Sequence, residues 1–109
     1  MTEIFNRQDL LERLEGDEEI LEVLVQTFLE YTPEQIQGIR HALDAGDARE
    51  VQQQAHSLKG AAASISAGAL RDAALQVELA GKNGALEQVR SLVETLIWEF
   101  ENLKKALAG

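Results

Sequence analysis

The 109-residue chain contains no cysteine, only one proline and few aromatic residues. Without cysteine, disulfide frameworks and thiolate metal sites are excluded. With one proline and little β-branched alternation, the chain is predicted to be all-α, and its length predicts one domain over residues 1–109. There is no apolar run of transmembrane length and no basic-then-apolar signal peptide, so we expect a soluble, cytoplasmic protein.

Positive charge is also scarce, because 10 Lys and Arg face 19 Asp and Glu and give a net charge of −9. This balance opposes binding to nucleic acid or to an anionic membrane surface, and it favours a monomer whose partners are not strongly acidic. Several motifs are missing as well. The chain has no P-loop, no glycine-rich nucleotide loop, no His-Glu-x-x-His zinc motif and no Glu-x-x-His pair for a di-iron bundle. We therefore expect neither an ATP site nor a metal or cofactor.

Apolar residues recur at helical spacing along the whole chain. A short segment over 4–15 is closed by Gly16, and Asp17 is predicted to cap the next helix. Thr32-Pro33-Glu34-Gln35 fits either a second capping box or one long helix kinked at the proline. Ala45-Gly46 ends this part. The predicted apolar face before Pro33 comprises Ile20, Leu21, Leu24, Val25 and Phe28.

The second half is predicted to hold three helices. Asp47 caps one that runs to about Ile65, a corner follows at 66–68, and the next helix buries Leu70, Ala73, Ala74 and Val77. Gly81-Lys82-Asn83-Gly84 is predicted to be a loop by its composition. The last helix, over 86–107, has apolar residues at alternating spacings of three and four, which is typical of one strut of a bundle.

The stretch around His56 is the most informative part of the chain. Val51, Ala55, Leu58, Ala62 and Ile65 form one core-facing stripe. His56 lies about 140° from the middle of that stripe, so its imidazole is predicted to point into solvent. Its neighbours on the same side of the helix are Gln52, Lys59 and Gly60, one turn away, and Ala63, two turns away.

These neighbours suggest chemistry at His56. A neutral imidazole offers a nucleophilic ring nitrogen near pH 7. Lys59, with a solvated side chain, places a cation one turn from the ring, and Gln52 places a hydrogen-bonding amide one turn away on the other side. Gly60 costs about 1 kcal/mol relative to alanine in a helix. Either an incoming surface or a neighbouring helix of the same chain must need the space.

His56-Ser57-Leu58-Lys59-Gly60, followed by two alanines, resembles the signature of histidine phosphotransfer (HPt) domains. The resemblance extends to the acidic N-terminal helix pair, to Gly46-Asp47, and to Leu70 and Glu78. It implies an antiparallel four-helix bundle with a short N-terminal capping helix. It further implies that His56 is the phosphoacceptor, and that Glu78 accepts the other ring N–H and fixes the tautomer. With a phosphoryl group on His56, Lys59 is expected to offset its charge and Gln52 to hydrogen-bond the ring or the phosphate.

The chain departs from the family where Ser66-Ala67 replaces a Gly-Ala pair that helps to end the helix. Two explanations fit: Ser66 caps the next helix, or Gly68 makes the turn. Residues of the following helix are candidates for partner docking. Leu75 and Leu79 lie off its core stripe between Arg71, Glu78 and Lys82. We predict docking for Leu75, together with Ala63, Arg71 and Lys82, and packing for Leu79. His41, without a glycine beside it, is predicted to be an ordinary surface residue.

The resemblance implies a phosphorelay intermediate that takes a phosphoryl group from a receiver-domain aspartyl-phosphate and passes it to another receiver. The receiver, free-standing or part of a hybrid histidine kinase, brings Mg²⁺, and the chain itself is a carrier rather than an enzyme. Two alternatives remain. One is the phosphoacceptor domain of a chemotaxis-type kinase, and the other is an interaction bundle whose His56 is never modified.

Overall fold

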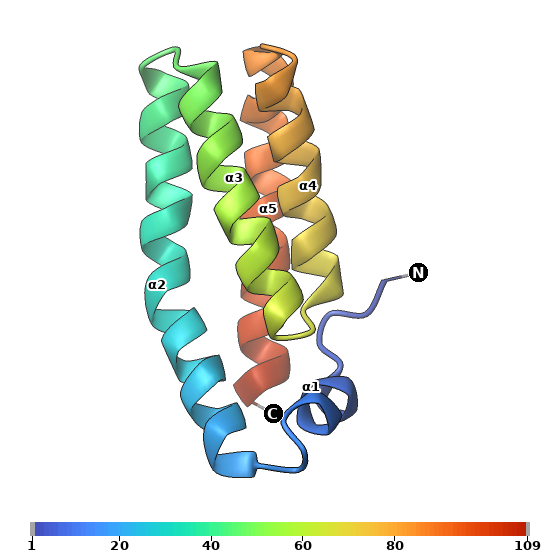
Figure 1. Cartoon of the computed structure of the whole chain (residues 1–109). Helices are drawn as coiled ribbons and strands as arrows, with labels where there is room; N and C mark the ends of the chain where they lie inside the picture. The colour runs from blue at the N-terminus through green and yellow to red at the C-terminus, as the bar shows by residue number, and fades with distance from the viewer. Residues whose placement is uncertain (1, 109) are drawn as a thin grey trace.

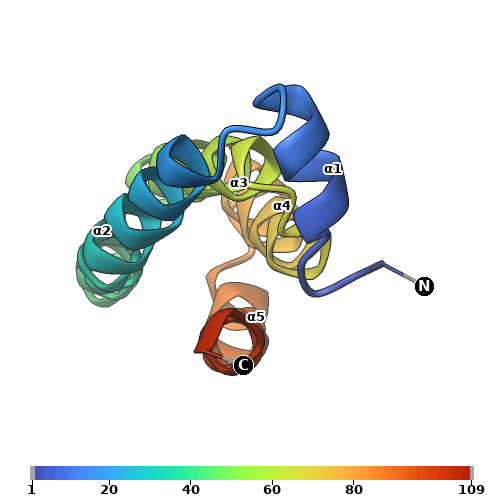
Figure 2. The same ribbon diagram turned by 90° about the horizontal axis from the view of Figure 1, so that it is seen from below.

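The computed structural model describes residues 2–108, and all regular structure in that range is helical, which confirms the all-α prediction. The helices and their bounds are α1 (Arg7–Arg13), α2 (Glu18–Asp44), α3 (Ala48–Ser64), α4 (Gly68–Lys82) and α5 (Leu86–Ala108). The long helices α2 to α5 lie side by side, and consecutive ones run in opposite directions (Figure 1). The short α1 crosses one end of this group (Figure 2).

Aspartates begin two of these helices where the sequence predicted. The Asp17 carboxylate accepts a hydrogen bond from the backbone N–H of Ile20 at the start of α2. The Asp47 carboxylate does the same for Glu50 at the start of α3. Each cap satisfies a backbone donor that the first helical turn leaves without a partner. The start of the helix that carries His56 is thereby fixed by local sequence.

Pro33 lies inside α2, so the single long helix is the correct alternative and a second helix beginning at Thr32 is wrong. Thr32 is buried, and its hydroxyl donates to the Phe28 carbonyl at 2.7 Å instead of capping a new helix. Proline removes one backbone donor from a helix, and helices commonly bend at such a residue. Figure 1 shows that α2 changes direction along its length.

The core is built mainly from aliphatic side chains of α2 to α5. α4 packs most extensively on α3, whereas α2 and α5 touch only narrowly. The fully enclosed large side chains include Ile39, Leu58, Leu70, Leu96 and Leu103. Because Leu58 is buried, the rotation of α3 about its own axis is fixed. His56, Lys59 and Gly60 are therefore directed outward or along the seam with α4.

The corner between α3 and α4 follows neither of the two predicted explanations. Ser66 itself makes the turn, with a φ of 60°, while Ala67 precedes α4 as an N-cap without a side-chain hydrogen bond. The Ala67 N–H donates to the Ala62 carbonyl and the Ser66 N–H to that of Ala63, which is a Schellman ending. Ser66 therefore occupies the left-handed position that glycine usually takes.

The N-terminal segment supports this corner from outside. The Ser66 hydroxyl donates to the Asp9 carboxylate at 2.7 Å, and the Arg13 guanidinium donates to the same hydroxyl. Arg13 also donates to the last carbonyls of α3, those of Ala63 and Ser64, at 3.3 Å each. The Asn6 N–H donates to the Ser66 carbonyl. α1 thus ties down the C-terminal end of the helix that carries His56.

Gly81 is helical and buried, so the predicted loop begins too early. A Cβ at this position would lie 2.9 Å from the backbone nitrogen of Gln52 and 3.2 Å from the carbonyl oxygen of Ala48. Only a residue without a side chain allows α4 to approach the α3 backbone this closely. Asn83 ends the helix and Gly84, with a φ of 68°, makes the turn.

Candidate functional site

His56 projects from the outer side of α3, as the helical periodicity predicted, and 66% of its side-chain surface is exposed. Its Nδ1 atom lies 2.8 Å from Oε2 of Glu78, which reaches across from α4. The Glu78 side chain is only 14% exposed. The close approach of α4 to α3 at Gly81 brings these two side chains together, although they are 22 positions apart in the sequence.

Lys59 contacts the other oxygen of the same carboxylate. Its Nζ atom lies 2.7 Å from Oε1 of Glu78, and its side chain is 25% exposed. The expectation of a solvated lysine is therefore wrong, because the ammonium lies in an ion pair at the seam between α3 and α4. The contact with the Lys59 ammonium lowers the pKa of Glu78 below its ordinary value of 4.5, against the burial that raises it, and the hydrogen bond with His56 lowers it further.

The charge of Glu78 decides which nitrogen of His56 is free. An ionised carboxylate has no proton to donate, so the 2.8 Å contact requires Nδ1 to carry the hydrogen. In the neutral imidazole the lone pair then lies on Nε2. The largely exposed ring directs an unprotonated nitrogen away from the carboxylate.

The surroundings of His56 on α3 are open. A Cβ at Gly60 would meet no atom within 4 Å, so the explanation by close packing of a neighbouring helix is wrong for this residue. Ala63 is exposed one turn further on. Gln52 is half-buried and lines a shallow hollow together with His56 and Glu78, but no side-chain hydrogen bond joins it to either of them in the described part of the chain.

The docking residues predicted on α4 share one side of that helix. Arg71 and Lys82 are exposed, and Leu75 is half-buried. Their spacing places them in the row that contains Glu78. Leu79 is 43% exposed, so the prediction that it is packed is wrong. This side of α4 carries two cations and partly exposed leucine surface beside the imidazole.

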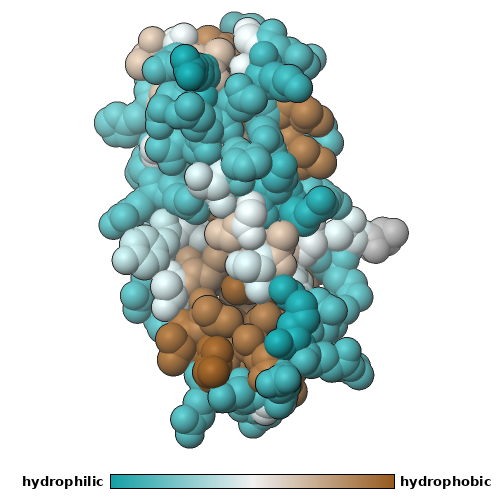
Figure 3. Space-filling view, viewed as in Figure 1, coloured by the Kyte–Doolittle hydropathy of each residue, from teal (hydrophilic) through white to brown (hydrophobic). Residues whose placement is uncertain are grey.

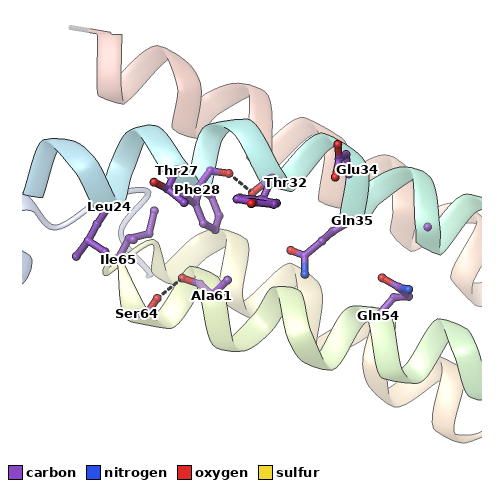
Figure 4. A pocket seen from close by; sticks show the side chains of 12 residues that line it. Leu24, Thr27, Phe28, Thr32, Glu34, Gln35, Gln54, Ala61, Ser64 and Ile65 are labelled. Carbon is purple, nitrogen blue, oxygen red and sulfur yellow. Dashed lines mark hydrogen bonds between the residues drawn. The ribbon is translucent and has the colours of Figure 1, made fainter.

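An apolar groove between α2 and α3 is a feature that the sequence reasoning missed. It lies on the other flank of α3 from Glu78, and Leu24, Phe28 and Ile65 line its apolar end (Figure 4). Figure 3 shows apolar side chains gathered over the same part of the molecule. Ile20 and Leu24, predicted for the core, are 47% and 37% exposed. The signal in the sequence was the width of the apolar face, which is greater than packing against one partner requires.

Four small residues lie between His56 and the apolar end of this groove, and two of them, Ala61 and Ser64, are part of its lining. Ser57, Gly60 and Ser64 are exposed and Ala61 is half-buried, and we call them the small-residue ridge. Because none of these side chains is long, a flat partner surface is able to contact the groove and the imidazole together. The ridge thus joins two features that the sequence presents separately.

The other candidate features give less support for a functional site. His41 is exposed in the last turn of α2 and makes no side-chain hydrogen bond within residues 2–108. Over the described range, no group of three or more His, Asp or Glu side chains is arranged to hold a metal ion. None of the helices described in the structure is long and apolar enough to cross a membrane.

Comparisons with known proteins agree with the geometry. The model of the Hpt domain family matches residues 23–108. Among solved structures, the chain is similar to histidine-containing phosphotransfer protein B (HptB) from Pseudomonas aeruginosa PAO1, with 26% sequence identity and a TM-score of 0.88. That match covers 97% of this chain and 92% of the other. No curated protein sequence matches.

Proposed function

The chain belongs to the histidine phosphotransfer (Hpt) domain family of two-component phosphorelays, and from this premise we propose that His56 is its phosphoacceptor. The observation that carries the proposal is the exposed imidazole whose Nδ1 is held by Glu78 at 2.8 Å. This contact directs the nucleophilic Nε2 towards a partner. We take residues 1–109 as one domain, an antiparallel four-helix bundle capped by α1, which serves as a rigid carrier of that nitrogen.

The transfer step balances without a proton leaving the domain. The Nε2 lone pair of His56 attacks the phosphorus of a receiver aspartyl-phosphate, a P–N bond forms, and the bond between phosphorus and the acyl oxygen breaks. The electron pair of the broken bond leaves with the aspartate carboxylate. The ring keeps its hydrogen on Nδ1 and becomes cationic, and the Glu78 carboxylate beside it balances that charge. The reverse step loads the next receiver.

The partner supplies what this domain lacks. We expect the receiver to bring Mg²⁺ and its own acidic pocket, while this domain needs no cofactor and hydrolyses no nucleotide. As an aspartyl-phosphate is already activated, positioning of Nε2 is the main contribution of the carrier. The domain acts as a phosphoryl carrier whose activity appears only with a partner.

We propose that the receiver docks on the face shown in Figure 3. On one flank of His56 lie Ala63 and the α4 residues Arg71, Leu75 and Lys82. On the other flank the small-residue ridge leads to the α2–α3 groove with its apolar end at Leu24, Phe28 and Ile65. A partner that must reach His56 therefore meets apolar surface next to it. Such transient contacts typically bury less than about 1,200 Å².

The test is phosphoryl transfer to variants of the two histidines. We expect His56→Gln to accept no label from a panel of receiver domains charged with acetyl phosphate, and His41→Gln to accept it at the wild-type rate. Acid-labile label that persists on His56→Gln would exclude His56 as the acceptor. A parallel reaction with ATP and a histidine kinase domain, without receivers, identifies a chemotaxis-type phosphoacceptor if it alone gives label.

A further inference from the structure

Lys59, His56 and Glu78 form a chain of contacts through one carboxylate. Oε2 of Glu78 faces Nδ1 of His56 at 2.8 Å, and Oε1 faces Nζ of Lys59 at 2.7 Å. Oε1 is shielded from solvent and has no hydrogen-bond partner of good geometry in the described residues, so the ammonium of Lys59 is its compensating charge. Lys59 is therefore engaged with Glu78 before any phosphoryl group arrives.

Direct contact between Lys59 and a phosphoryl group on Nε2 conflicts with this arrangement. If the ammonium moved away to the phosphoryl group, it would leave behind a carboxylate oxygen that is cut off from solvent. Such an oxygen is costly to leave without a compensating charge, more so than one in water. The contact that exists in the structure runs instead from Lys59 to Glu78 and from Glu78 to the imidazole.

The charged groups around His56 allow Lys59 to influence the imidazole through Glu78. From α3, the charged groups on this side are Lys59 and Arg49, which lines the same hollow, and from α4 they are Glu78 and Lys82. Glu78 is the one acid among these four, and it is in direct contact with the ring. Arg49 and Lys82 are exposed and hence screened. The net field at the imidazole is set by whether Lys59 neutralises Glu78.

We infer that Lys59 is a positioning residue that acts on His56 through Glu78, by neutralising the carboxylate so that Nε2 stays unprotonated and nucleophilic near neutral pH. Without the ammonium, a poorly solvated carboxylate 2.8 Å from Nδ1 favours the imidazolium form, because an adjacent opposite charge stabilises a charged group. Imidazolium carries hydrogens on both nitrogens and has no lone pair to attack phosphorus. The expected change in phosphorylation rate rests on the proposed function of His56, whereas the expected change in the protonation of His56 does not.

The experiment compares wild type with Lys59→Met, which keeps a long side chain without charge, and with Lys59→Arg, which keeps the charge. NMR of ¹⁵N-labelled histidine follows His56 across pH, with His41 as an internal control in every sample. Phosphoramidate serves as phosphoryl donor, so no cognate receiver is needed. Thermal melts establish that each variant is folded.

In Lys59→Met we expect the midpoint of the His56 titration to move upward by about 0.5 unit or more, while that of His41 stays in place. Phosphorylation should fall about twofold or more at pH 6.5 and return close to the wild-type rate at pH 9, because most of the imidazole is then neutral in both proteins. Lys59→Arg should resemble wild type. In a Glu78→Gln background, Lys59→Met should no longer move the midpoint.

A rate that falls by the same factor at every pH, with an unmoved His56 midpoint, would overturn the inference and assign Lys59 to the phosphoryl group itself. A midpoint that still moves in the Glu78→Gln background would also overturn it, because the effect would then bypass Glu78. If wild type takes up no phosphoryl group either from phosphoramidate or from charged receivers, the proposed function fails while the NMR titrations still decide the inference.

Discussion

Gly60 and Gly81 are both helical glycines close to the same histidine, and they lie in opposite environments. Around Gly60, on the solvent side of α3, a Cβ would meet no atom within 4 Å. At Gly81, on the α4 side of the seam, a Cβ would lie 2.9 Å from a backbone nitrogen of α3 and 3.1 Å from a methyl group of Val51. Glycine in a helix costs about 1 kcal/mol relative to alanine at either place. The space left by the missing side chain is filled at Gly81 and open at Gly60.

The difference between the two glycines shows that the two sides of α3 have different structural requirements. Its seam with α4 needs close contact, because only then does Glu78 reach His56 and Lys59. Under the proposed function, its outer side needs clearance, because a partner has to approach Nε2. Substitutions at the seam should therefore change stability, whereas substitutions on the outer side should change transfer. The same chemical change, glycine to alanine, tests both statements.

Gly81→Ala should give the largest loss of stability. The added methyl group inserts volume into a filled interface bounded by backbone atoms, which costs about 1–3 kcal/mol and outweighs the gain of up to about 1 kcal/mol in helix propensity. For a domain of this size, a net loss of 1 kcal/mol lowers the melting temperature by about 4–8 °C. Thermal and urea unfolding of wild type and variant measure the change.

Gly84→Ala is an unsuitable control for this experiment, because Gly84 has a φ of 68° and any side chain there is strained. Gly60→Ala is the matched control, since Gly60 is also helical but unconfined. If Gly81→Ala melted at or above the wild-type temperature, the seam would be looser than the structure indicates, and the placement of Glu78 would need another explanation.

Gly60→Ala should raise the free energy of unfolding by up to about 1 kcal/mol, through helix propensity and a less flexible unfolded chain. The bulkier Gly60→Gln should keep the fold but obstruct the approach to His56, so phosphoryl acceptance from a receiver should fall while the melting temperature holds. Phosphoramidate is small, so transfer from it should be much less affected. Equal losses with both donors would contradict obstruction of a docking surface.

Local sequence accounts for the helices and for the exposure of His56, because caps and periodicity act within a few residues. Asp17 and Asp47 cap as predicted, and the stripe through Leu58 fixes the rotation of α3. Gly81 was assigned to a loop because composition does not distinguish a turn from a close helix contact. Ser66 was misjudged for a related reason: its left-handed conformation is supported by Asp9 and Arg13, more than 50 positions away.

The site was predictable only in part. The i+3 spacing brings Lys59 near His56, but its ion pair with Glu78 depends on how closely α3 and α4 approach. Family resemblance supplied Glu78 itself, which periodicity alone did not. The α2–α3 groove is not predictable in the same way, because Ile20 and Leu24 fit a core pattern and sequence does not reveal which part of an apolar helix face lacks a packing partner.

The smallest expected effect is the pH dependence that Glu78 adds to stability. Its ion pair with Lys59 lowers the pKa of Glu78 in the folded state below 4.5, so the folded protein binds the proton less readily than the unfolded chain. The contribution is then fully present above about pH 4.5 and is lost as the pH falls through the lowered value. The difference in unfolding free energy between wild type and Glu78→Gln should shrink as the pH falls below about 4.5. Urea unfolding from pH 5 to 3 measures it, with Glu22→Gln on the exposed side of α2 as the control for the loss of one acidic group. A difference that grows towards low pH would mean that Glu78 does not carry its charge in the folded state, and the assignment of the hydrogen to Nδ1 of His56 would fall with it.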